Sequence, residues 1–120
     1  IKDITKEESI ATFIAGIVRS VRFGFASSHG KANMMCYNYM EDHGAFTRNE
    51  EGKWVIDFEK APAVIDSWAN LILETQATGN FEFAQNYSSE NASIREALAA
   101  DIEKVNLAGI PRDIVFDFAW

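Results

Sequence analysis

Apolar residues recur every three or four positions in the first third of the chain, a spacing typical of amphipathic helices. The capping-box pair Thr5 and Glu8 predicts the start of a first helix, which Gly24 ends or loosens. Its inward face is expected to consist of Ile10, Phe13, Ile14, Ile17, Val18 and Val21. Ser27 or Ser28 caps a second helix that stops at Gly44. This second helix carries His29, Met34, Met35, Tyr37, Tyr39 and Met40.

The spacing then changes to alternation. Residues 45–48 and 53–57 are short runs rich in aromatic and β-branched side chains, and Gly52 lies in the connection between them. A glycine in a four-residue connection predicts a β-hairpin. Trp54, Ile56 and Phe58 alternate with the other residues of the second run, so one face of that strand is expected to be buried.

Helical spacing returns in the second half. Asp57 is predicted to cap a third helix, with Pro62 in its first turn and Gly79 as its stop. Its core stripe is expected to be Val64, Ile65, Trp68, Leu71 and Ile72. A short helix over 80–87 follows. Ser93 and Glu96 repeat the capping-box spacing before a last helix that Gly109 closes. Its inward residues are expected to be Ile94, Leu98, Ile102 and Val105.

Pro111 breaks the pattern, and residues 114–118 are predicted to form a final strand. The fold class is therefore mostly α (α+β), a helical domain with a small β-hairpin and a C-terminal strand. With 120 residues, 48% of them hydrophobic, the chain is long enough for one domain, 1–120, with its own core.

Composition excludes several partners. The net charge of −7 and the scattered Lys and Arg residues leave no basic stripe for nucleic acid. No apolar run approaches the ~20 residues of a membrane span, so no membrane partner is expected. Cys36 is the single cysteine and cannot form an internal disulfide. Together with the lack of a signal peptide, it predicts a cytoplasmic protein.

Candidate chemistry centres on His29. It lies near a helix start between Ser28 and Gly30, where its ring could donate to a carbonyl or stabilise an oxyanion. The alternative is a hydrogen-bonded structural histidine. His43 lies on a different local element, so the two histidines lack the one-turn spacing of a zinc helix. A stand-alone metal enzyme would have to gather His29, His43 and Cys36 by folding, and no metal site is expected in this chain.

Several segments together resemble one family. They are residues 17–24 (IVRSVRFG), 29–34 (HGKANM), 38–39, 44–46, 57–60, 79–80 and 110–116 (IPRDIVF). In this order they resemble the C-terminal region of bacterial members of the dipeptidyl peptidase III family. These zinc-dependent exopeptidases remove dipeptides from the N-termini of short peptides. The match spans nearly the whole chain and is fairly specific.

The resemblance implies that the zinc site lies in another part of the parent protein. The family's zinc ligands lie on a His-Glu-x-x-Gly-His helix and a later Glu-Glu-containing helix, both upstream of the matched part. This sequence has no His-Glu-x-x-Gly-His motif, and its Glu7-Glu8 and Glu50-Glu51 pairs are expected to be solvated. Residues 1–120 are therefore expected to be a fragment of the C-terminal part of a larger peptidase, without a cofactor of their own. Zinc is expected in the upstream part. A chain that begins with Ile1 rather than Met agrees with a cut from a longer polypeptide.

The resemblance also implies roles for three residues. His29 aligns with a family histidine that contacts the substrate and stabilises the transition state. The nearby basic residue of the animal enzymes falls on Asn33, and Lys31 is a loose substitute for it. Some relatives carry a fused Nudix-type domain, but this sequence contains no Nudix box.

The leading hypothesis is a substrate-cleft-forming domain of a dipeptidyl-peptidase-III-like zinc exopeptidase, inactive in isolation. Its expected partners are the peptide substrate and the zinc-bearing lobe of the same parent chain. The alternative is a non-catalytic helical interaction module that keeps the fold without the zinc site.

Overall fold

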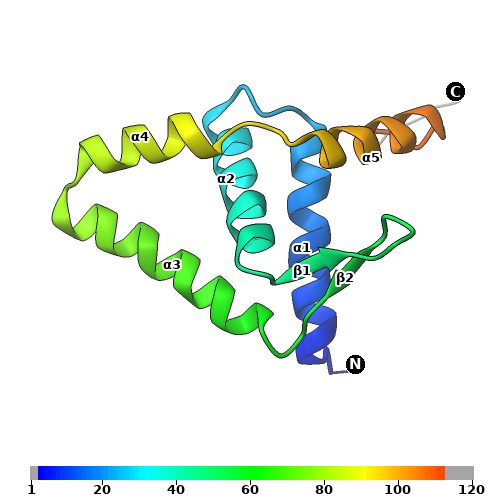
Figure 1. Cartoon of the computed structure of the whole chain (residues 1–120), viewed down its shortest axis with the longest axis horizontal. Coiled ribbons are helices and arrows are strands. Elements are labelled where there is room, and N and C mark those ends of the chain that lie inside the picture. The colour runs from blue at the N-terminus through cyan, green and yellow to red at the C-terminus, as the bar shows by residue number, and fades with distance from the viewer. Residues whose placement is uncertain (1–2, 113–120) are drawn as a thin grey trace, which may run out of the picture.

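The computed structural model describes residues 3–112, which form five helices and one two-stranded hairpin. In chain order these are α1 (Lys6–Arg22), α2 (Ser28–Asp42), β1 (Phe46–Arg48), β2 (Trp54–Ile56), α3 (Ala61–Thr78), α4 (Phe81–Asn91) and α5 (Glu96–Leu107) (Figure 1). The prediction of a mostly helical fold with a small hairpin is confirmed. The strand predicted over 114–118 lies outside the described residues. No described helix has the length and apolar character needed to cross a membrane.

The predicted capping box begins α1. The Thr5 side chain accepts a hydrogen bond from the Glu8 amide at 3.1 Å, and the Glu8 carboxylate accepts one from the Thr5 amide at 2.9 Å. The buried stripe is narrower than predicted and consists of Ile10, Ile14, Ile17 and Val21. Phe13 was expected to face inward but is 42% exposed. It lies at the edge of the stripe that packs on α2, where side chains are only partly covered.

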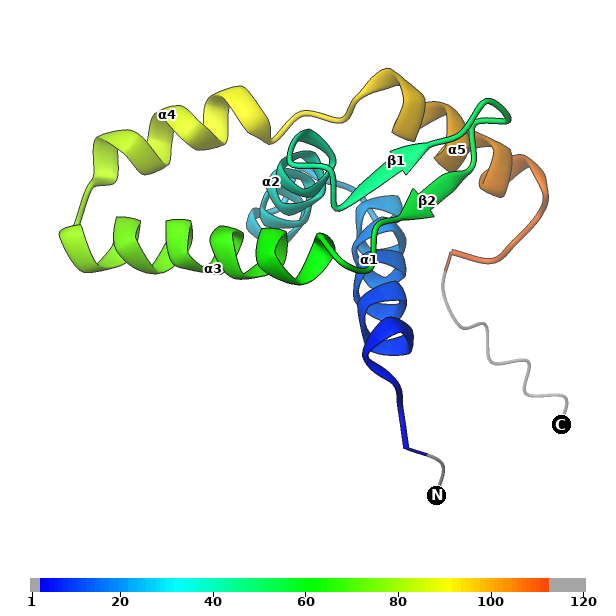
Figure 2. The same cartoon turned by 60° about the horizontal axis from the view of Figure 1, so that its bottom comes forward.

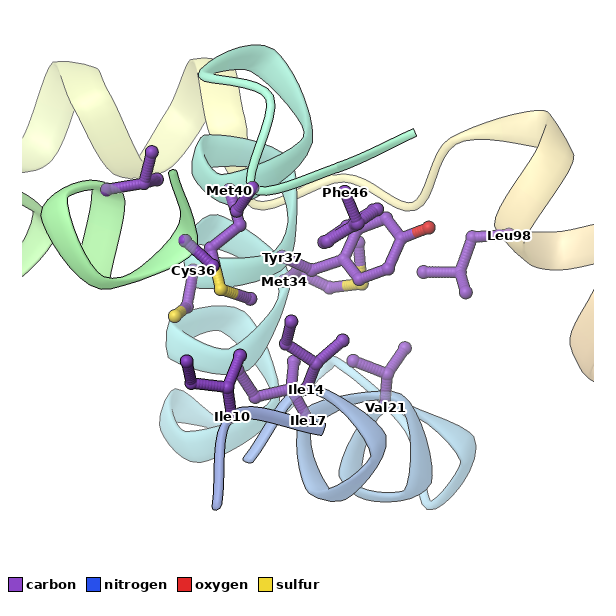
Figure 3. Packing of buried hydrophobic residues seen from close by; sticks show 13 residues of the cluster. Ile10, Ile14, Ile17, Val21, Met34, Cys36, Tyr37, Met40, Phe46 and Leu98 are labelled. Atoms are coloured by element: carbon purple, nitrogen blue, oxygen red, sulfur yellow. The ribbon is translucent and has the colours of Figure 1, made fainter. Parts of the chain in front are cut away.

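The second helix, α2, is the centre of the fold and contacts α1, α3, α4 and β1. Ser27, one of the two predicted caps, accepts a hydrogen bond from the Gly30 amide at 3.1 Å. Met34, Tyr37 and Met40 are fully buried, and Figure 3 shows them between the α1 stripe and the rest of the core. Because α2 is buried on several sides, its packing determines how the remaining elements are arranged.

The hairpin pairs β1 with β2 antiparallel, with Phe46 opposite Ile56 and Arg48 opposite Trp54. Phe46 is fully buried, Trp54 and Ile56 pack against the core, and Val55 is 49% exposed. The predicted alternation is therefore confirmed within the strand. Phe58 continues the alternation in sequence, but it follows the end of β2 and is 39% exposed.

The next two helices form an arm that leaves the core and returns, with its corner at Gly79 (Figures 1 and 2). The predicted stop is confirmed, because Gly79 is the left-handed C-cap of α3 at φ 62°. The cap at the other end differs from the prediction. Lys60 is the N-cap, and Asp57 instead accepts hydrogen bonds from the amides of Glu59 and Lys60 in the preceding turn.

The arm is less buried than the sequence predicts. The buried residues of α3 are Ala61 and Val64, whereas Ile72 is 38% exposed because it lies in the half of α3 that extends beyond the core. The fourth helix runs to Asn91 rather than ending at residue 87, and it contributes no buried residue. The apolar stripe of α3 therefore continues beyond the part of the helix that the core covers.

The last helix begins later than its sequence suggests. The predicted capping box at Ser93 does not form, and Arg95 is the N-cap, without a side-chain cap. The link before α5 is held in another way, because Asn38 binds the carbonyl of Ser93 at 3.0 Å and Arg95 pairs with Glu41 and Asp42. Leu98 is fully buried, as predicted, and Gly109 follows the helix end at φ 72°.

Candidate functional site

The first turn of α2 carries the histidine that the sequence singles out. A short loop over residues 23–27 connects α1 to this turn, and Gly24 within it has a φ of 119° that L side chains rarely adopt. The loop backbone lies directly on α2 at Gly30, which is buried. Ser27 then closes the turn as an acceptor, because its hydroxyl oxygen accepts a hydrogen bond from the Gly30 amide and its carbonyl oxygen accepts one from the Lys31 amide at 2.9 Å.

His29 itself is exposed and makes no hydrogen bond or ion pair with any other described residue. Asn33 follows one helical turn later on the same face and is half-buried. Lys31 is also exposed, but at about 100° per residue it lies on the opposite side of the helix from His29. The fold therefore brings His29 and Asn33 together and separates Lys31 from both.

Lys31 borders a groove that lies between the start of α2 and α4. The groove has a volume of about 650 Å³. It is lined by Phe25, Lys31, Phe81, Ala84, Gln85, Ser88, Ser89, Ala92 and Ser93. An ammonium group beside serine hydroxyls and two phenyl rings can accept a ligand that combines an anionic end with an apolar group. The sequence did not indicate that α4 contributes to this groove, because the contribution depends on the return path of the arm.

The other end of α2 holds a different cluster of charges. Arg95 contacts Glu41 at 2.6 Å and Asp42 at 2.8 Å. The hydrogen bond from Arg95 lowers the pKa of Asp42 below its ordinary value. His43 ends this helix, with its Nδ1 2.8 Å from the Tyr39 carbonyl oxygen and its ring stacked on Tyr39. The Arg95 pairs therefore fasten the end of α2 to the start of α5, whereas the contacts of His43 are with Tyr39 in its own helix.

The residues of the stand-alone metal hypothesis are not gathered. Cys36 is buried, and burial raises the pKa of its thiol to about 11, so it is a poor source of thiolate. Among residues 3–112 no three His, Cys, Asp or Glu side chains lie close enough to hold a metal ion. The described residues therefore do not fit a zinc site.

Sequence reasoning missed a polar network inside the fold. Tyr37 is fully buried, and its hydroxyl accepts hydrogen bonds from Trp54 at 2.9 Å and Arg48 at 3.3 Å. The Arg48 guanidinium lies 4.6 Å from the centroid of the Trp54 ring and also pairs with Asp101 of α5. The network joins α2, the hairpin and α5, which identifies it as structural.

Most of the chain shares its fold with parts of known proteins. No protein-family model matches the chain. Two solved structures match its fold with a TM-score of 0.79, dipeptidyl-peptidase III from Corallococcus sp. strain EGB and DPP III from Caldithrix abyssi. Their sequences are 30% and 31% identical to it, over 87% and 90% of this chain. The chain is a dipeptidyl-peptidase-III-like region.

The DPP-III-like region spans 19% and 20% of those two bacterial chains. A plant protein is similar as well. Nudix hydrolase 3 of Arabidopsis thaliana is 31% identical over 108 residues, which make up 90% of this chain and 14% of that protein. The match relates the region to one part of the plant protein and assigns no nucleotide chemistry to it. In all three relatives most of the protein lies beyond what is matched here.

Proposed function

We propose that this DPP-III-like region lines the substrate cleft of a larger zinc exopeptidase that removes dipeptides from the N-termini of short peptides. One observation carries the proposal, namely the match of nearly the whole region to about a fifth of two bacterial dipeptidyl-peptidase III structures. The exposed His29 supports it, because its ring nitrogens are available to a ligand. In isolation the region would be inactive.

Within the cleft, His29 would donate a hydrogen bond to the carbonyl oxygen beside the scissile bond. A preorganised donor at this position stabilises the negative charge that develops on that oxygen as the bond breaks. Asn33, on the same face, would bind the peptide backbone through its amide. Lys31 lies on the other side of α2 and would bind a separate part of the peptide, such as a carboxylate.

The metal and the general base would come from the zinc-bearing lobe of the same parent chain, because the described residues offer no ligand set. The partners of the region are then that lobe and the peptide substrate, without nucleic acid or membrane. A cytoplasmic location agrees with the lone, buried Cys36.

The test uses the natural full-length protein and a fluorogenic dipeptide amide. Replacing His29 with Ala should lower kcat about 10²- to 10³-fold, the usual cost of removing one oxyanion donor, with a smaller change in KM. His43→Ala is the matched control, because His43 is exposed at the far end of the same helix and should leave kcat unchanged.

Two results would contradict the proposal. Unchanged kcat in His29→Ala would remove the catalytic role from this residue. A zinc-loaded, folded full-length protein that binds peptides without cleaving them would identify the region as an interaction module.

A further inference from the structure

Gly30 is the point where the loop before α2 rests on the helix. A Cβ atom added to Gly30 would meet the carbonyl oxygen of Gly24 and would lie 2.5 Å from the Cα of Phe25. Both are backbone atoms, so no side-chain rotation can relieve the contact. Only glycine fits at this position, although Gly30 itself has ordinary helical geometry.

The contact is coupled to the start of the helix. Only Ala26 separates Phe25 from Ser27, the N-cap that holds the first turn through the Gly30 and Lys31 amides. A loop pushed away from residue 30 would therefore pull on Ser27 and weaken the same two hydrogen bonds. The first turn has little other support, because residues 27–29 are exposed.

The direction of His29 depends on that turn. Because no described side chain holds its imidazole, only the backbone conformation of the first turn and its rotamer preference determine where the ring lies. We propose that Gly30 is a positioning residue for His29, seating the Gly24–Phe25 backbone on α2 so that the first turn presents the imidazole in one direction. This proposal rests on the function proposed above and adds a residue that touches no substrate.

The structural part can be tested on the 120-residue chain by NMR. Gly30→Ala should shift the amide signals of residues 24–31 and move or broaden the imidazole signals of His29, while those of His43 stay in place. Gly16→Ala is the matched control, since it adds the same methyl group to a helical glycine with nothing within 4 Å of the new Cβ. Unchanged signals at residues 24–31 and at His29 in Gly30→Ala would overturn the proposal.

A second variant keeps the test decisive if Gly30→Ala does not fold. Ser27→Ala adds no atom and removes the bond to the Gly30 amide, so it should move the same signals to a smaller extent. A folded Ser27→Ala protein with His29 signals identical to those of the unmodified chain would overturn the proposal as well.

The catalytic part needs the natural full-length protein. At a temperature well below the unfolding midpoint, Gly30→Ala should lower kcat about 10- to 100-fold, as expected when a catalytic group is misplaced by about an ångström, and change KM less. Gly16→Ala should leave kcat unchanged. A role in stability alone would lower the unfolding midpoint without this loss of kcat.

The two proposals fail separately. If His29→Ala loses activity and Gly30→Ala does not, the positioning role is wrong and the function of His29 stands. If His29→Ala keeps full activity, the proposed function fails, and the positioning role for catalysis fails with it.

Discussion

Replacing Asn38 should show how α2 holds the link between α4 and α5. Asn38 is the buried polar residue among the described core positions, with 3% of its surface exposed. Its side-chain nitrogen donates to the carbonyls of Asn91 at 2.8 Å and Ser93 at 3.0 Å. Carbonyls only accept, so this pairing also fixes which side-chain atom is the nitrogen.

The expected loss of unfolding free energy in Asn38→Ala can be worked out from these hydrogen bonds. Two hydrogen bonds of about 0.5–1.5 kcal/mol each are lost, and two carbonyls lose their side-chain donor. Part of this is offset, since the buried oxygen of Asn38 has no partner and alanine favours a helix by up to about 0.7 kcal/mol. We expect the free energy of unfolding to fall by about 2 kcal/mol, a large share of the roughly 5–15 kcal/mol typical of a domain.

Urea unfolding followed by circular dichroism measures this change. Asn70→Ala is the matched control, because Asn70 is exposed in the interior of α3, so the variant has the same gain in helix propensity without the two bonds. If the free energies of unfolding of Asn38→Ala and Asn70→Ala differ by less than about 0.5 kcal/mol, the two hydrogen bonds of Asn38 do not stabilise the link, and the reasoning is refuted.

Asn38→Asp tests the same two hydrogen bonds through the pH dependence of stability. A carboxylate cannot donate and would face two carbonyl oxygens in a buried position, so the folded state would raise its pKa. The loss of stability should therefore be greatest at neutral pH and should shrink as the pH falls below that raised pKa, where the acid gains a donor. An unfolding free energy that tracks the unmodified chain at every pH would contradict this.

Three further outcomes are expected. Leu98→Ala should cost about 2–5 kcal/mol in urea unfolding because Leu98 is fully buried, whereas Leu107→Ala, 78% exposed, should cost less than about 0.5 kcal/mol. Burial opposes but does not cancel the lowering of the pKa of Asp101 by Arg48 and Lys104. The ionised Asp101 stabilises the fold above its unfolded pKa of 3.8, and this contribution is lost as the pH falls through the lower folded pKa. Asp101→Asn should therefore reduce the fall of the unfolding free energy at acid pH. Cys36, with a pKa of about 11 instead of 9.0, should react with iodoacetamide at pH 8 about 100-fold more slowly in the folded chain than in urea, and equal rates would contradict its burial.

Local signals predicted the helix ends that depend on neighbouring residues. Thr5 with Glu8 and the left-handed Gly79 satisfy backbone groups within one turn, so the sequence contains everything these ends require. The Ser93 prediction was wrong because a distant contact decided the outcome. Asn38 and Arg95 hold the residues before α5 in place, and the helix begins after them.

Burial was predicted less well than helix position. The spacing of Phe13 and Ile72 suits an inward face, but whether a face is covered depends on which element packs there.

The candidate site, too, could be predicted only in part from the sequence. The cap at Ser27 placed His29 in the first turn of α2, and helical geometry separates Lys31 from it. The groove beside Lys31 could not be predicted, because α4 reaches it only through the return of the arm.

The arm formed by α3 and α4 has a consequence for how the chain opens. Helix α4 contributes no buried residue, whereas α2 is packed on several sides. Helix α4 should therefore have a lower local stability than α2. In native-state hydrogen exchange the amides of α4 should exchange through small, local openings. The amides around Met34 and Tyr37 should exchange only when the whole domain unfolds. Helix α4 can thus unfold and refold many times within the lifetime of one folded core.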